Sequence, residues 1–363
     1  MRLRSALVVA LFFLGTGPGR ADAQDGFPDS FQLVLGDLRP GAGVSAGADY
    51  EKSHFATSFF DLRLSTRIST RLYQRHEAAI LIPHFFEPRL FLEVLGQYRS
   101  FTEVSYFGMG RATLEEDRSD YHIEGPILFA TLGFRSSSRF VFGGRFGMLE
   151  NDLHSGRSSD LPSVEEAFPV EELPGFVEEP DYLLYSAFAA LDGRNDAEDP
   201  TRGYFLELQA TSYRDRGFDR FNFEEATVEA HYFVPLDYRT VLASRVRGVF
   251  TRAGEGQEIP FYLLPTLGGT RNLQAFETDR FRDRNSLLVT GELRYQATPE
   301  IRLEASLDVG QVFPSFAEAR FSELEVGAGV GARYKMGRKI LVGVSLGVGR
   351  EGARFSMTGG FRF

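Results

Sequence analysis

Hydrophobic and polar residues alternate along much of the chain. Between 301 and 310 the odd positions are apolar, whereas the even positions are polar or glycine. Successive side chains of a β-strand point to opposite faces of its sheet, so this segment predicts a strand with one apolar and one polar face. The same alternation returns over 203–214, 221–234 and 354–363.

Two kinds of protein can contain such strands. A soluble secreted sandwich or propeller buries its apolar faces and exposes the polar ones, whereas a membrane barrel turns its apolar faces to lipid and encloses a wet lumen. Strands long enough to cross a bilayer at a tilt, each with a charged face, favour the barrel. We therefore predict an all-β protein, a 16-stranded antiparallel transmembrane β-barrel.

The predicted strands are 29–37, 42–50, 56–66, 69–82, 88–100, 120–133, 138–150, 182–192, 203–214, 221–234, 239–251, 286–296, 301–311, 323–334, 339–349 and 354–363.

The connections between these strands give a second argument. Outer-membrane barrels have an even number of strands, short periplasmic turns and long external loops. The long connections all follow odd-numbered strands: 101–119, 151–181, 252–285 and 312–322. The short ones all follow even-numbered strands: 134–137, 235–238, 297–300 and 335–338. A strand miscounted anywhere would break this agreement.

The first 23 residues have the pattern of a secretory signal. Arg2 and Arg4 precede an apolar run over 6–14, and Ala21-Asp22-Ala23 provides a cleavage site. A membrane anchor is the alternative, but a spanning helix needs about 20 apolar residues. We therefore assign 1–23 to a signal peptide and 24–363 to the barrel, which places the protein in a cell outer membrane of the Gram-negative type.

Aromatic residues support this location. The chain has 35 Phe and 14 Tyr but no Trp, and aromatic girdles mark the membrane interfaces of barrels. Phe361 and Phe363 lie on one face of the last predicted strand. They suit a closing strand that ends in the periplasmic girdle.

The residues give little support to an enzyme. There is no cysteine, no G-x-S-x-G or H-E-x-x-H motif, and no nucleotide-binding glycine loop before a helix. His154 beside Ser155 and His231 near Glu229 are read as ordinary polar residues.

The net charge of −10 argues against a nucleic-acid partner. The acidic loop 151–181 favours a solvated external loop over a calcium site, because no known ligand spacing occurs in it. We expect no enzymatic activity, metal or cofactor.

The segment 267–283 is too polar and glycine-rich for a strand. Glu292 and Asp308 fall on the polar faces of the strands that follow it. Glycines occupy the same face of the next two strands at 327, 329, 331, 343, 347 and 349. Runs of strand glycines often mark a close backbone approach, so we expect this loop to fold inward against them. The alternative is that the glycines only ease the curvature of the barrel.

The loop resembles a motif of the BamA/TamA family, also called the bacterial surface antigen family. That motif reads Gly-Gly-x-x-x-Leu-Arg-Gly-Phe/Tyr and then Arg-x-Arg-Asp. Gly268, Gly269, Leu273 and Phe276 match it, whereas Gln274 and Ala275 replace the arginine and the second glycine. A second stretch resembles the family's Asp-x-Arg-Asn…Pro-x-Arg-Gly periplasmic turn at Asp192, Arg194, Asn195, Pro200, Arg202 and Gly203.

The resemblance implies sixteen strands and an inward-folded sixth external loop whose arginine contacts acidic strand residues. Glu292 and Asp308 stand at those acidic positions. Because Gln274 replaces the arginine, we expect Arg280 or Arg282 to take over its contact.

The resemblance also implies a role in inserting or translocating other outer-membrane proteins through a weak seam between the first and last strands. Only a few residues separate Ala23 from the first predicted strand, so we expect no POTRA domains. The implied partners are outer-membrane lipids, with unfolded outer-membrane proteins or a separate periplasmic partner. The alternative is a passive channel, or a structural or surface-interaction barrel with a plugged lumen. Full pairing between the first and last strands would favour that alternative.

Overall fold

The computed structural model describes residues 30–36, 38–39, 41–55, 59–336 and 339–358. The predicted signal peptide and both Phe361 and Phe363 lie outside these ranges. The described chain is almost wholly strands and connections, and its one α-helix, α1, covers only Val164–Ala167. No helix among the described residues is long and apolar enough to cross a membrane.

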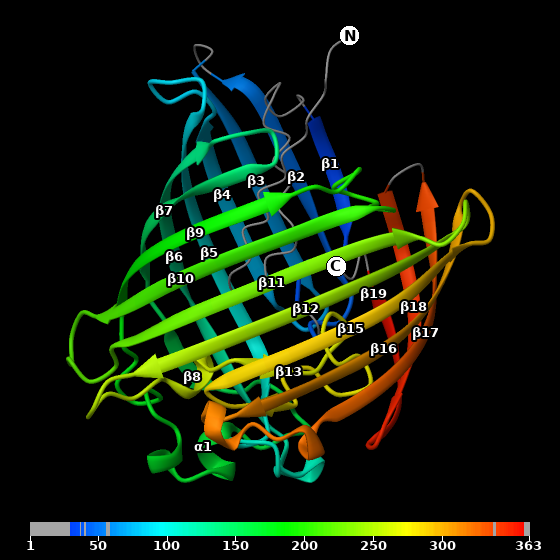
Figure 1. Ribbon diagram of the computed structural model, residues 1–363. Helices are drawn as coiled ribbons and strands as arrows, with labels where there is room; N and C mark the ends of the chain where they lie inside the picture. Colours follow the sequence, from blue (N-terminus) through cyan, green and yellow to red (C-terminus); the bar gives the residue numbers. More distant parts are fainter. Residues whose placement is uncertain (1–29, 37, 40, 56–58, 337–338, 359–363) are drawn as a thin grey trace.

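One antiparallel sheet curls round on itself and contains all the long strands (Figure 1). Its strands are β1 (Ser30–Leu35), β2 (Ser45–Phe55), β3 (Phe60–Ser69), β4 (Gln74–Ile82), β5 (Leu90–Tyr106), β6 (Ser119–Arg135), β7 (Phe140–Leu149), β8 (Asp152–Ser155), β9 (Tyr182–Asp192), β10 (Gly203–Asp215), β11 (Phe223–Pro235), β12 (Thr240–Ala253), β15 (Asn285–Gln296), β16 (Ile301–Phe313), β17 (Glu325–Met336), β18 (Lys339–Gly349) and β19 (Gly352–Thr358). A separate two-stranded ladder joins β13 (Thr266–Leu267) to β14 (Phe281–Arg282).

Neighbouring strands pair in chain order, with one interruption. Both β7 and β8 pair with β6, along consecutive parts of its length. The break at residues 150–151 lies opposite Gly125 and Pro126, where the Glu150 N–H donates to the Pro126 carbonyl at 3.1 Å. A β-carbon on Gly125 would lie 2.3 Å from the Glu150 carbonyl oxygen. Glycine and proline thus allow a local bend in the strand predicted over 138–150.

Several predicted boundaries were wrong by a few residues. The fourth strand was expected from 69 but β4 begins at Gln74, because Ser69–Tyr73 forms a turn in which Leu72 has a φ of 61°. β5 and β6 extend beyond their predicted external ends, to Tyr106 and back to Ser119. The predicted loop at 101–119 is therefore shorter than expected.

Burial is inverted relative to a soluble protein. Leu307 and Val326 are 52% and 49% exposed, whereas Asp308 and Glu292, on the opposite face of the sheet, are 0% and 2% exposed. Water-soluble sheets do not bury charge and expose leucine in this way, but a sheet with lipid outside does. The fold therefore confirms an all-β architecture with an apolar outer face and a polar, ion-paired inner face.

Candidate functional site

The segment between β12 and β15 lies on the polar face of the sheet, where the short β13–β14 ladder closes its central part into a loop. Gly268 and Gly269 start that loop with φ angles of +118° and +94°. A β-carbon on Gly268 would lie 2.0 Å from the Glu277 carbonyl oxygen. Both predicted glycines thus occupy backbone conformations that other residues rarely adopt.

Three predicted motif residues anchor this loop. Leu273, Ala275 and Phe276 are buried in one cluster, whose other members are Leu267, Phe281, Leu288 and Val312. Because Leu288 and Val312 belong to β15 and β16, the cluster fixes the loop to the sheet.

The glycines of β17 and β18 leave the space that the loop fills. A β-carbon on Gly329 would lie 1.4 Å from Gln274 Nε2, and one on Gly327 would lie 2.7 Å from Ala275 Cβ. One on Gly347 would lie 2.7 Å from the Gln274 carbonyl oxygen. These distances are far below van der Waals contact, so the loop needs a wall without side chains at these positions.

Gln274, which stands where the family motif has arginine, contacts β16 through uncharged donors. Its Nε2 donates to Ser306 Oγ at 2.6 Å, and its backbone N–H donates to Asp308 Oδ2 at 3.3 Å. Thr290 Oγ1 donates to the other oxygen of Asp308 at 2.8 Å. The carboxylate of Glu292 accepts from Arg294 Nε at 2.6 Å on the same strand.

The expectation that Arg280 or Arg282 takes over the contact with Glu292 or Asp308 was wrong. Arg280 is 1% exposed and pairs with Glu351, in the turn between β18 and β19, with Nη2 and Oε1 2.9 Å apart. Arg282 donates from Nη1 to the Phe261 carbonyl at 2.7 Å and stacks among aromatic rings. Arg280 ends the tight turn at 277–280, and Arg282 follows it in β14.

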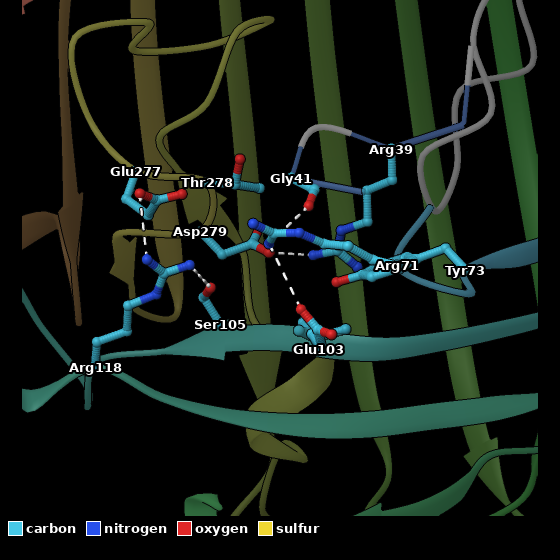
Figure 2. A pocket seen from close by; sticks show the side chains of 11 residues that line it. Arg39, Gly41, Arg71, Tyr73, Glu103, Ser105, Arg118, Glu277, Thr278 and Asp279 are labelled. Atoms are coloured by element: carbon cyan, nitrogen blue, oxygen red, sulfur yellow. Dashed lines mark hydrogen bonds and ion pairs between the residues drawn. The ribbon is translucent and has the colours of Figure 1, made fainter. Parts of the chain in front are cut away.

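That turn pairs with charged residues from two other connections (Figure 2). Asp279 pairs with Arg39, from the connection between β1 and β2. Glu277 pairs with Arg118, from the β5–β6 connection, at 3.4 Å. Glu277 also pairs with Arg354 of β19. The space among these side chains is about 10 Å³, which holds little more than one water molecule.

Neighbouring residues stabilise the ionised form of the Asp279 carboxyl. Burial alone would raise the pKa of this carboxyl, but the positive charges of Arg39 and Arg282 outweigh it and a hydrogen bond from Thr266 Oγ1 adds to their effect. The pKa of Asp279 therefore lies below its usual range. The carboxylate in turn raises the pKa of Arg39 against the lowering effect of burial, so both partners are charged at neutral pH.

The predicted turn motif is a compact structure between β9 and β10. Asp192 accepts from the Arg194 backbone N–H and Nε at 3.0 Å each, and from Nη2 at 2.7 Å. Asn195 Oδ1 accepts from the backbone N–H groups of Thr201 and Arg202 at 3.0 Å each. Pro200 is buried, and Gly203 has a φ of +107°.

The same turn also reaches across the polar face, which the sequence did not predict. Asp199 accepts from Arg302 Nη1 of β16 at 2.7 Å and pairs with Lys335 of β17. The partners of Arg39, Glu277 and Glu351 were missed for the same reason. Their only sequence signal is a charged residue in a connection, and nothing local says which distant connection it meets.

No group of three or more metal-ligating side chains occurs among the described residues. His231 Nε2 lies 2.8 Å from Glu229 Oε1 on the polar face, and Arg245 also donates to that carboxylate oxygen. His154 is exposed and lies 3.6 Å from Glu124.

Comparison with known proteins identifies this architecture. The model of the Omp85 superfamily domain matches residues 179–355, which include β9 to β18, the loop and the turn motif. The chain carries an Omp85 superfamily domain. The resemblance to the BamA/TamA family is thereby confirmed, and the superfamily indicates an outer-membrane location.

Solved structures show the same fold. This Omp85 protein matches the crystal structure of BamA from Haemophilus ducreyi lacking POTRA domains 1–3 with a TM-score of 0.70 and 15% identity, over 91% of this chain and 70% of that chain. CdiB from Acinetobacter baumannii matches with a TM-score of 0.52 and 12% identity, over 91% of this chain and 59% of that chain. CdiB from Escherichia coli matches with a TM-score of 0.59 and 12% identity, over 91% of this chain and 62% of that chain. The chain thus spans about three fifths of each CdiB structure. A comparison with curated proteins finds no significant match.

Proposed function

We propose that this protein is an outer-membrane barrel that inserts or translocates other outer-membrane proteins through a seam between β1 and β19. The proposal rests on the backbone pairing of these two strands. Among the described residues, β1 pairs only with β2 and β19 only with β18. Unpaired strand edges are templates for pairing with another chain.

The geometry of β1 shows which groups would receive a client strand. The Gly36 N–H donates to the Ser45 carbonyl of β2 at 2.7 Å. Because hydrogen bonding alternates along an antiparallel strand, Val34 and Gln32 also face β2, whereas Leu33 and Leu35 direct their backbone groups to the free edge. Leu33 is 82% exposed.

The proposal includes a closed sixteen-stranded barrel. Counting β7 and β8 as one interrupted strand, because both pair with β6, gives an even number of crossings. The loop at 267–283 then folds inward and fills part of the lumen as the sixth external loop. Residues 1–23 would act as the signal peptide that exports residues 24–363. Its partners would be outer-membrane lipids, with unfolded outer-membrane proteins or a separate periplasmic partner.

A passive barrel with a plugged lumen is the second candidate. The buried ion pairs on the polar face favour it: Glu229 lies 2.6 Å from Arg245 Nε and 3.1 Å from Arg247 Nε. These charges neutralise one another inside the sheet, so they suit a sealed lumen better than an ion path. Conductance across a planar bilayer separates a sealed barrel from an open pore.

Reconstitution tests the first candidate. The purified protein is placed in liposomes, an unfolded model outer-membrane protein is added, and folding is followed by its heat-resistant migration. We expect faster folding than with empty liposomes. Leu33→Pro removes one N–H from the free edge and should abolish the acceleration while the barrel stays folded. Equal rates with and without the wild-type barrel would refute the insertion role.

A further inference from the structure

We propose that the turn at Glu277–Arg280 is a latch that holds the seam between β1 and β19 closed by side-chain ion pairs in place of backbone pairing. Its role as a gate for client strands rests on the proposed function. The latch itself rests only on contacts within this chain.

The turn contacts both sides of the seam. On the side of β1, Asp279 pairs with Arg39, which lies four residues after the end of β1. On the side of β19, Glu277 pairs with Arg354 of β19, and Arg280 pairs with Glu351, just before β19. Three residues within four positions therefore connect two strands that share no ladder among the residues that the structure describes.

The backbone of the turn explains how it can reach both sides. Asp279 has a φ of +58°, and the Arg280 N–H donates to the Glu277 carbonyl at 3.2 Å. Left-handed residues are typical of tight turns, and the side chains of this one meet partners on both sides of the seam. Such a strained backbone persists only where its surroundings hold it, and these are often functional sites.

A third contact holds the latch to the rest of the barrel. Arg280 donates from Nη1 to Thr113 Oγ1 at 2.8 Å and from Nη2 to the Thr113 carbonyl at 2.7 Å. Arg118 Nη1 lies 3.4 Å from Glu277 Oε2. Both partners belong to the β5–β6 connection, which also pairs with β19 through Glu115 and Arg354, so the turn keeps this support when its contact with Arg39 opens.

Because Asp279 and Arg280 are buried, we expect the latch to be either fully closed or fully open. Arg280 is 1% exposed and Asp279 8% exposed. Removing one partner of a buried ion pair leaves the other charge without compensation, so a half-open latch is unfavourable. A client strand that adds backbone hydrogen bonds at β1 would offset the loss of these pairs, and the seam would then open as a unit.

Spin-label distances test the latch without any client. The chain has no cysteine, so Leu33→Cys and Met357→Cys put one label on each seam strand, at exposed outer-face positions. We expect Asp279→Asn and Arg280→Gln, each in the reconstituted full chain, to lengthen the label distance by about 5 Å or more, the spacing of one strand. Arg39→Gln should match Asp279→Asn, and the double variant should add nothing further because both remove one interaction.

The matched control is Glu258→Gln. Glu258 lies in the same connection between β12 and β15, but it pairs with Arg220 at 2.8 Å. Its removal should leave the label distance unchanged. Unchanged distances in both Asp279→Asn and Arg280→Gln would overturn the latch.

A disulfide lock keeps the test decisive if these variants fail to fold. A β-carbon on Gly41 would lie 3.5 Å from Thr278 Cβ, within disulfide range. Oxidised Gly41→Cys/Thr278→Cys should reduce client folding to the empty-liposome rate, and reduction should restore it, whereas Thr278→Cys alone should not respond. Where the wild-type barrel accelerates client folding, an oxidised lock that leaves this acceleration unchanged would overturn the latch.

The outcomes separate the two proposals. Longer label distances without client acceleration in any variant support the latch and refute insertion. Constant label distances with wild-type acceleration refute the latch and support insertion.

Discussion

Gln274 donates a hydrogen bond to Ser306 of β16 through a gap that only glycine at position 329 leaves open. The bond is 2.6 Å long, and a β-carbon on Gly329 would lie 1.4 Å from Gln274 Nε2. The loop therefore contacts β16 through a neutral amide at the position where the family motif has a guanidinium.

The first prediction concerns this gap. Gly329→Ala should displace Gln274 and cost about 1–3 kcal/mol, the usual penalty for overpacking a filled site. The temperature at which the folded barrel changes to its unfolded migration should fall, and the loop should become sensitive to trypsin. The control is Gly291→Ala on β15, where an added β-carbon meets nothing within 4 Å. Equal behaviour of the two variants would show that the loop does not need the glycine wall.

The sequence predicted the glycine face of β17 and β18 but not the ion pairs of the latch, for a physical reason. Alternation along a strand is local, so the faces of Asp308 and Gly329 could be read from positions two residues apart. Arg39 and Asp279 are 240 residues apart, and no periodicity connects them. Their meeting depends on how the whole sheet curls, which side-chain spacing within one strand does not encode.

The error over Arg280 has a similar origin. Sequence proximity to the missing arginine suggested that it would replace that contact, but one tight turn at Asp279 redirects the chain. The interruption between β7 and β8 did have a local signal, because Gly125-Pro126 lies inside the strand predicted over 120–133. A proline without an N–H group inside a paired strand favours a bulge.

The second prediction concerns Arg280. Arg280→Ala leaves the carboxylate of Glu351, whose side chain is 9% exposed, without its buried partner and with the exposed Arg350 at 3.7 Å. Breaking such a pair costs about 3–5 kcal/mol, so the heat resistance of the barrel should fall markedly. Arg280→Lys should recover little of it, because an ammonium group cannot reproduce the fork that reaches both Glu351 and Thr113.

Arg284→Ala is the control for that experiment. Arg284 is exposed and lies four residues further along the chain, and its alanine variant should retain wild-type heat resistance. If Arg280→Ala were as heat-resistant as Arg284→Ala, the contact between Arg280 and Glu351 would contribute nothing to stability.

The third prediction concerns the turn between β9 and β10. A β-carbon on Gly203 would lie 2.2 Å from the Gly193 carbonyl oxygen, in addition to the strain of its positive φ. Gly203→Ala should therefore slow folding into liposomes and lower the heat resistance of the product. Gly352→Ala isolates the two effects, since Gly352 has a φ of +108°, close to the +107° of Gly203, but open space around it. Equal losses in the two variants would assign the whole effect to backbone strain and none to the contact with Gly193.

The last prediction concerns pH. Because Arg39 and Arg282 hold the pKa of Asp279 below its unfolded value despite burial, the charged carboxylate stabilises the folded loop. This contribution is fully present above the unfolded pKa of about 4 and is lost as pH falls through the lower folded pKa. Tyr73 and Tyr121 also face this pair, but neutral phenols do not titrate in acid.

Proteolysis of the loop, measured with an acid-active protease, should therefore increase as pH falls below about 4 in the wild type. Asp279→Asn should be cleaved readily by trypsin at neutral pH, and with the acid-active protease it should show a smaller acid-dependent increase, because other carboxylates still titrate. A wild type and an Asp279→Asn variant with the same pH profile would show that Asp279 does not link loop docking to protonation.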